Sequence, residues 1–79
     1  MNKGQENALA WIMGWMDENL DERGVRKAPR RNTVIASGHS IHVPQLQGKG
    51  YLQYTRNGIY PTAKAQAWWI RRKGGASRF

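Results

Sequence analysis

The N-terminal part of the chain has the apolar spacing of one amphipathic helix. Its large apolar side chains follow the i, i+3, i+4, i+7, i+11 pattern and share one face: Leu9, Ile12, Met13, Met16 and Leu20. Trp11 and Trp15 widen this face on one side, and most of the acidic residues lie opposite. The pattern predicts a helix over residues 4–21 that ends near Gly24, because glycine readily takes the left-handed conformation that closes helices.

Capping residues predict two short helices in the middle of the chain. Asn32 suits the N-cap of a helix over residues 33–37, and Gly38 suits its end. Ser40 can begin a second helix that runs to residue 47. Pro44 then falls in the first turn of this helix, where its missing N–H costs little.

A pair of strands is the alternative for the same segment. Residues 33–36 and 41–43 contain several β-branched side chains, which are enriched in strands, and residues 37–40 would form the turn between them. The capping residues favour the two helices, and the choice decides the fold.

The clearest local signal is a β-hairpin. Residues 51–54 alternate between the two faces of a strand, and the dipeptide Asn57-Gly58 is a strong signal for a two-residue hairpin turn. Residues 59–61 return as the second strand.

A last helix follows the hairpin over residues 63–72, with Thr62 as its N-cap. Its predicted apolar side is made of small and aromatic residues, with Ala63, Ala67 and Ile70 on the face and Ala65 and Trp69 at the edge. Trp68 points away from this face. Residues 74–79 are predicted to form a flexible tail, since unanchored chain ends are usually poorly ordered.

Charge divides the chain into two unequal parts. All five acidic residues lie within residues 6–22, whereas residues 23–79 carry twelve of the thirteen Lys and Arg and no acid. Unopposed like charge destabilises a compact domain, so a surface of one sign indicates a polyanionic partner. The 79 residues and the net charge of +8 predict a single domain, residues 1–79 with a basic loop at 22–31, that binds nucleic acid.

The composition argues against catalysis, a metal site and a membrane span. The chain has no Cys, and His39 and His42 alone cannot form a zinc site. No acid lies near Ser37, Ser40 or the histidines in the sequence to complete a catalytic triad. No apolar run reaches the roughly 20 residues that cross a bilayer. We therefore expect a soluble, cytoplasmic protein that is not an enzyme and uses no cofactor.

In this order, the predicted elements resemble a small winged helix-turn-helix domain of prokaryotic or phage type. The resemblance covers residues 32–72, through three segments: Ser37–Leu46 in the helix pair, Lys49–Leu52 at the entry to the wing, and Ile59–Thr62 before the last helix. It implies an α+β fold with a long first helix, a short helix pair, a β-hairpin wing and a C-terminal helix. It also implies a transcriptional or phage regulatory factor that binds duplex DNA.

The same resemblance implies which residues contact DNA. The second helix of the pair would enter the major groove, with its core-facing residues Ile41, Val43 and Leu46 behind it. Its exposed polar residues would contact base edges: His39, Ser40, His42 and Gln45. The wing tip would contribute Arg56 and Asn57. Phosphate contacts would come from basic side chains: Lys27, Arg30, Arg31, Lys49 and Lys64.

Three other kinds of partner stay open. Trp68 is a candidate anchor for a protein partner, as in a phage effector that inhibits a host nucleic-acid machine, and Pro44 within the recognition helix favours this alternative. Trp11 and Trp15 either form a homodimer surface or belong to the core. An RNA- or ribosome-associated protein would carry the same basic surface.

Overall fold

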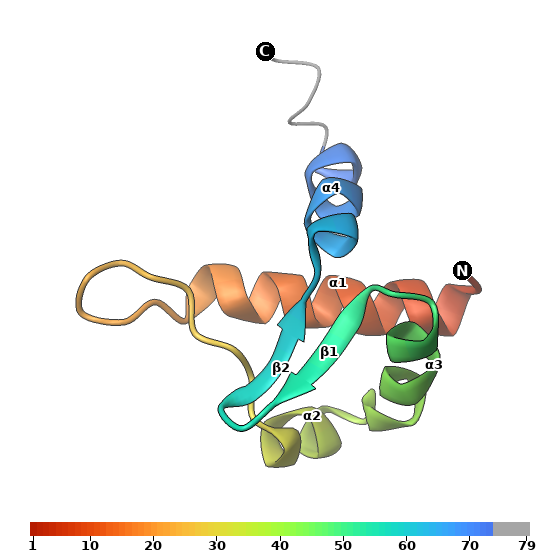
Figure 1. Ribbon diagram of the computed structural model, residues 1–79, viewed down its shortest axis with the longest axis horizontal. Helices are drawn as coiled ribbons and strands as arrows, with labels where there is room; N and C mark the ends of the chain where they lie inside the picture. Colours follow the sequence, from red (N-terminus) through yellow and green to blue (C-terminus); the bar gives the residue numbers. More distant parts are fainter. Residues whose placement is uncertain (74–79) are drawn as a thin grey trace.

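Helices surround one antiparallel hairpin in the computed structural model, which describes residues 1–73 (Figure 1). Along the chain the elements are α1 (Lys3–Glu18), α2 (Arg31–Ser37), the 3-10 turn η1 (Ser40–His42), α3 (Val43–Gly48), β1 (Leu52–Thr55), β2 (Gly58–Pro61) and α4 (Ala63–Arg72). The fold is α+β, as predicted. The predicted flexible tail lies outside the described residues.

Helix α1 begins with a capping box. The Asn2 side chain accepts a hydrogen bond from the backbone N–H of Gln5 (2.8 Å), and the Gln5 side chain accepts one from the N–H of Asn2 (3.3 Å). The helix ends at Glu18, three residues before the predicted end, because the Asn19 side chain donates to the Trp15 carbonyl (2.7 Å) and stops it there.

The predicted inclusion of Leu20 in this helix was therefore wrong. Leu20 instead pairs with Arg26 across a turn and is 49% exposed. The Asp21 side chain fixes that turn by accepting from the N–H groups of Arg23 (2.8 Å) and Val25 (2.9 Å). The predicted basic loop thus begins as a structured turn.

The end of this loop lies against the hairpin. Pro29 is fully buried, and its carbonyl accepts a hydrogen bond from the N–H of Ile59 in β2 (3.0 Å). A Cβ atom on Gly58 would lie 2.6 Å from the same carbonyl oxygen, so this approach requires glycine. The extended segment before α2 is thereby joined to the hairpin.

Residues 31–48 form helices, as the capping residues favoured, and not strands. The boundaries differ from the prediction, since α2 begins at Arg31 with Arg30 as its N-cap residue and not after Asn32. Gly38 ends α2 in the left-handed conformation (φ 85°), as predicted. The second helix is divided into η1 and α3, with Pro44 in the first turn of α3.

The hairpin turn differs by one residue from the predicted turn. Thr55 pairs with Gly58, so Arg56 and Asn57 form the turn, and not Asn57 and Gly58. The Thr55 hydroxyl accepts from the N–H of Asn57 (3.2 Å) and donates to the carbonyl of Gly58 (3.0 Å). These two bonds and the close approach of Gly58 to Pro29 account for the shift.

The core lies between α1 and the other elements. It consists of eleven buried side chains: Ala8, Leu9, Ile12, Met13, Met16, Val34, Val43, Leu46, Leu52, Ile59 and Ala65. Ile41 was predicted to join Val43 and Leu46, but it is 70% exposed. A 3-10 turn has about 3.0 residues per turn and α-helix about 3.6, so Ile41 in η1 falls out of phase with α3.

The predicted apolar face of α4 was also wrong. Ala65 is buried, and Trp68 and Trp69 pack against the core, while Ala63, Ala67 and Ile70 are exposed. Burying an aromatic side chain removes far more apolar surface from water than burying alanine, so the two tryptophans determine which side faces inward.

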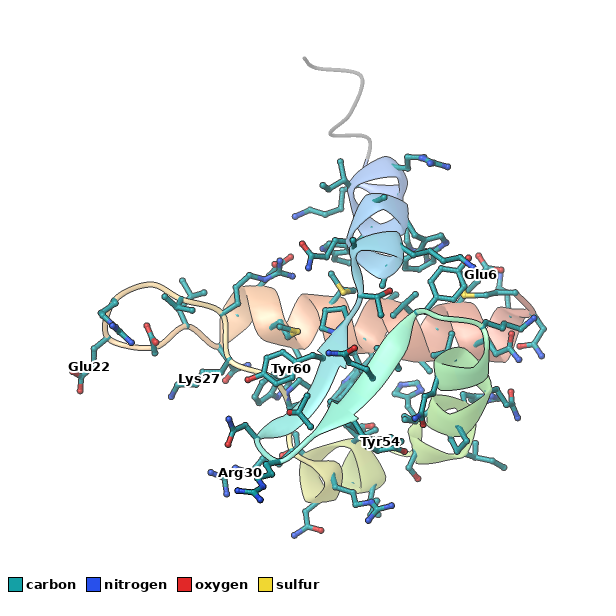
Figure 2. The ribbon with its side chains drawn as sticks, in the orientation of Figure 1. Glu6, Glu22, Lys27, Arg30, Tyr54 and Tyr60 are labelled. Atoms are coloured by element: carbon teal, nitrogen blue, oxygen red, sulfur yellow. The ribbon has the colours of Figure 1, made fainter. Side chains whose placement is uncertain are left out.

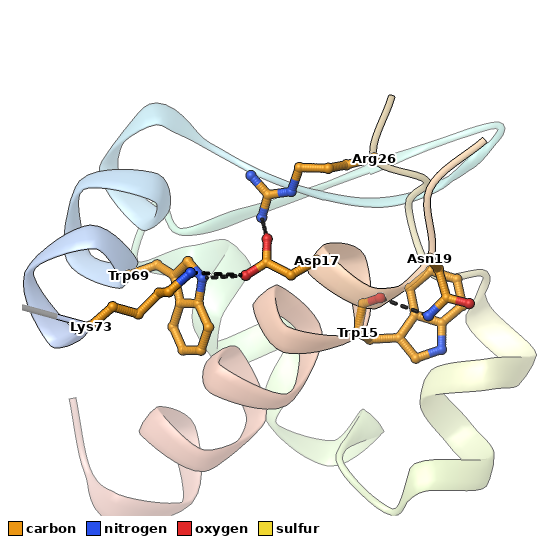
Figure 3. A network of polar contacts seen from close by, with 6 residues as sticks. All are labelled: Trp15, Asp17, Asn19, Arg26, Trp69 and Lys73. Atoms are coloured by element: carbon orange, nitrogen blue, oxygen red, sulfur yellow. Dashed lines mark hydrogen bonds and ion pairs between the residues drawn. The ribbon is translucent and has the colours of Figure 1, made fainter. Parts of the chain in front are cut away.

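Asp17 joins α1 to α4 and to the loop (Figure 3). Its carboxylate accepts from the indole N–H of Trp69 (3.0 Å) and from Lys73 Nζ (3.4 Å). Arg26 Nη2 lies 3.0 Å from the other carboxylate oxygen, as an ion pair without hydrogen-bond alignment. One acid near the end of α1 therefore pairs with an arginine of the loop that directly follows the helix.

Candidate nucleic-acid interface

Three arginines converge on an open cleft between the start of α2 and the tip of the hairpin. The cleft has a volume of about 540 Å³ and its polar lining comes from both elements: Arg30, Arg31, Asn32, Tyr54, Thr55, Arg56 and Asn57. Figure 2 shows Arg30 at the hairpin tip beside α2, with Tyr54 nearby. We call this feature the arginine cleft, defined by Arg30, Arg31 and Arg56.

The backbone brings these arginines together. The hydrogen bond between Pro29 and Ile59 holds the chain against β2, so the next two residues, Arg30 and Arg31, start α2 beside the hairpin tip. Arg56 lies in the turn of that tip. The Arg31 guanidinium lies 5.6 Å from the centre of the Tyr54 ring, within the range of a cation–π contact.

The arginine cleft lacks opposing charge. The ion pairs among residues 1–73 join Asp17 to Arg26 and Lys73, and Glu6 to Arg72, all away from the cleft. No acidic residue of the sequence follows residue 22. Three guanidinium groups without a counter-charge attract an anion, and each can bind a phosphate or carboxylate through two parallel hydrogen bonds.

The predicted lysine contacts lie elsewhere. Lys64 Nζ donates to the carbonyl of Lys49 (2.9 Å) and lies 4.5 Å from the centre of the Tyr51 ring, so it connects α4 to the start of the hairpin. Lys27 lines a separate hollow with Asp21 and Glu22, at the opposite end of the loop. The structure does not bring these lysines into the arginine cleft.

Two of the predicted base-contacting residues are engaged with α1. Gln45 Oε1 accepts from Gln5 Nε2 (2.8 Å) and lies 3.2 Å from His42 Nδ1. The His42 ring also lies over Gly4, where a Cβ atom would be 2.7 Å away. Gln45 keeps an exposed edge, but its carbonyl oxygen and the half-buried His42 hold α3 on α1.

The remaining predicted residues are partly covered. The His39 ring lies tilted against Trp11, with ring centres 5.7 Å apart, and Ser40 is half-buried beside Pro44. Trp68 is half-buried, stacks on Trp69 and has the Arg72 guanidinium 5.3 Å from its ring centre. The exposed surface of η1 and α3 presents Ile41, Pro44, Gln45 and Gln47.

Sequence reasoning missed Asn32 and Tyr54 as parts of the cleft. Tyr54 lies on the same strand face as Leu52 and opposite Ile59, so it extends the core-facing side of β1 to the hairpin tip. The alternation that predicted the strand contained this signal. The position of α2 beside that tip, which gives Tyr54 its contact with Arg31, had no signal in the sequence.

Comparisons with protein-family models, with curated proteins and with solved structures gave no match to this chain. Within residues 1–73, no group of three or more metal-ligating side chains comes together. None of the helices in this part of the chain combines the length and apolar character needed to cross a membrane.

Proposed function

We propose that this protein binds duplex DNA through the arginine cleft, with the hairpin acting as the wing of a winged-helix-like domain. The convergence of three unpaired arginines from α2 and the hairpin tip carries the proposal. Phosphate neutralisation by such side chains releases counterions from DNA, which supplies most of the sequence-independent affinity.

The order of elements supports the winged-helix part of the proposal. A long helix, an extended segment beside the hairpin, a short helix pair, the hairpin and a final helix follow one another in the chain. In this arrangement Arg56 and Asn57 form the turn of the hairpin, beside the start of α2.

Under this proposal, sequence preference is weak. The side chains best suited to contact base edges, His42 and Gln45, are held by α1, and phosphate contacts carry no sequence information. We therefore propose that the protein holds the DNA backbone and that α3 contributes little to base recognition.

Fluorescence anisotropy with a labelled duplex, titrated across salt concentrations, tests the proposal. Replacing Arg30, Arg31 or Arg56 by alanine should weaken binding to all sequences and reduce the log–log salt slope by about 1 for each lost phosphate contact. Arg23→Ala is the matched control, because it removes the same charge from a residue that lines a different hollow.

Equal affinities for the three cleft variants and the parent protein would refute the proposed site. Single-stranded DNA and structured RNA of equal charge serve as competitors. Stronger binding to structured RNA would mean that the arginine cleft binds RNA and not duplex DNA.

A further inference from the structure

An apolar hollow adjoins the arginine cleft and differs from it in the chemistry of its lining. It has a volume of about 240 Å³, and its floor is made of the buried side chains of Val34, Val43 and Ile59. Its rim carries Ile35, which is 54% exposed, together with Pro44 and Tyr54. Arg31, Tyr54 and Ile59 line both the hollow and the cleft, so the two are continuous.

A DNA backbone has no group that suits this hollow. Phosphates need charged or polar partners, and unpaired bases bind best against aromatic faces. The hollow has mainly aliphatic walls, and its one aromatic ring, Tyr54, already has Arg31 near it. An aliphatic or aromatic side chain of a protein fits these walls, since burying apolar surface there removes it from water.

Charge specifies the partner further. A segment that places an apolar side chain in the hollow brings its neighbouring residues to Arg30, Arg31 and Arg56, where carboxylates form bidentate pairs. A second copy of this chain is a poor occupant, because two molecules of net charge +8 repel each other. We infer that the hollow and the arginine cleft together dock an acidic segment of a partner protein, with one apolar side chain in the hollow.

This inference goes beyond DNA binding, and DNA and the acidic segment would compete for the arginine cleft. The hollow allows the two kinds of binding to be distinguished, because only the protein segment needs Ile35. A fluorescein-labelled peptide with one leucine between two pairs of glutamates is the probe. One control peptide carries serine in place of the leucine, and the other carries glutamines in place of the glutamates.

The leucine–glutamate peptide should bind more tightly than both control peptides and should displace duplex DNA. Ile35→Ser should weaken peptide binding about tenfold, since the lost apolar contact is worth roughly the free energy of a factor of ten. The same variant should bind DNA as the parent does, whereas Arg56→Ala should weaken both. Ile70→Ser is the matched control, because Ile70 is similarly exposed (47%) but lies on α4.

Absence of peptide binding, equal binding of the leucine and serine peptides, or equal peptide affinity for Ile35→Ser and Ile70→Ser would each overturn the inference. None of these results would affect the DNA proposal, which depends on the arginine variants alone. If instead the alanine variants of Arg30, Arg31 and Arg56 all left DNA binding intact while Arg56→Ala abolished peptide binding, the docking inference would stand without the DNA function.

Discussion

At the scale of single residues, Asp17 contacts three side chains: Trp69, Lys73 and Arg26. Burial alone would raise the pKa of Asp17, but the hydrogen bond from Trp69 and the charges of Arg26 and Lys73 outweigh it and hold the pKa below its ordinary value of 3.8. A carboxyl whose pKa is lower in the folded state stabilises the fold when it is ionised. Its contribution is complete well above pH 3.8 and is lost as the pH falls through the folded value.

We therefore expect Asp17→Asn to be less stable than the parent protein at neutral pH, with a difference that shrinks as the pH falls below 3.8. Urea unfolding followed by tryptophan fluorescence at neutral and acidic pH measures this difference. Glu18→Asn is the control, since Glu18 is exposed and forms none of the ion pairs described for residues 1–73. A difference that stays constant with pH would show that the Asp17 charge is not the cause.

At the scale of elements, the sequence predicted what depends on near neighbours. The apolar spacing of residues 9–16 identified the core face of α1, and Gly38 correctly ended α2, because both signals lie within one helix. The inward side of α4 could not be found from its alanine stripe. That side depends on the packing of Trp68 and Trp69 against the core, and Trp69 also donates to Asp17 across 52 positions of the chain.

The candidate site was predicted to the same extent. The winged-helix resemblance implied Arg30, Arg31 and Arg56 as candidate DNA contacts, but their convergence in one cleft depends on the bond between Pro29 and Ile59. His42 was expected to face outward, but its ring lies over Gly4. The sequence could not show this contact, since the two residues lie far apart in the chain. Such contacts leave no local pattern.

Two glycines of α1, Gly4 and Gly14, test the contact between α1 and α3. A Cβ atom at Gly4 would lie 2.7 Å from the His42 ring, which would have to move and leave Gln45. Gly4→Ala should therefore destabilise the protein by about 1–3 kcal/mol, as overpacking usually does. Gly14→Ala meets nothing within 4 Å and should stabilise it by about 0.5–1 kcal/mol through helix propensity.

Chemical denaturation of both variants measures this pair directly. Because both variants replace glycine by alanine in the same helix, opposite changes in the free energy of unfolding isolate the contact with His42. Stabilisation by both alanines would mean that the His42 ring moves aside freely and that the position of α3 does not depend on its contact with Gly4.

At the scale of the whole molecule, charge is distributed unevenly in space as well as in sequence. The acids Glu6 and Asp17 neutralise Arg72, Lys73 and Arg26, which hold α4 and the loop on α1. The arginine cleft receives no such partner among residues 1–73. A surface of this kind weakens the free protein through self-repulsion and becomes favourable when an anion binds.

The unpaired arginines should thus reduce stability while they support binding. We expect the double variant Arg30→Gln and Arg56→Gln to melt about 2–4 °C higher than the parent at low salt, since surface changes are worth up to about 0.5 kcal/mol in a domain of this size. Arg26→Gln is the opposite control and should lower the melting temperature, because it leaves Asp17 with one fewer cation.

Added salt should remove the increase in melting temperature of the double variant, because salt screens the repulsion that the substitutions relieve. A higher melting temperature that persisted at high salt would come from local packing. A lower melting temperature at low salt would mean that the two arginines stabilise the free fold. Either result would contradict the view that mutual repulsion in the cleft is relieved when an anion binds.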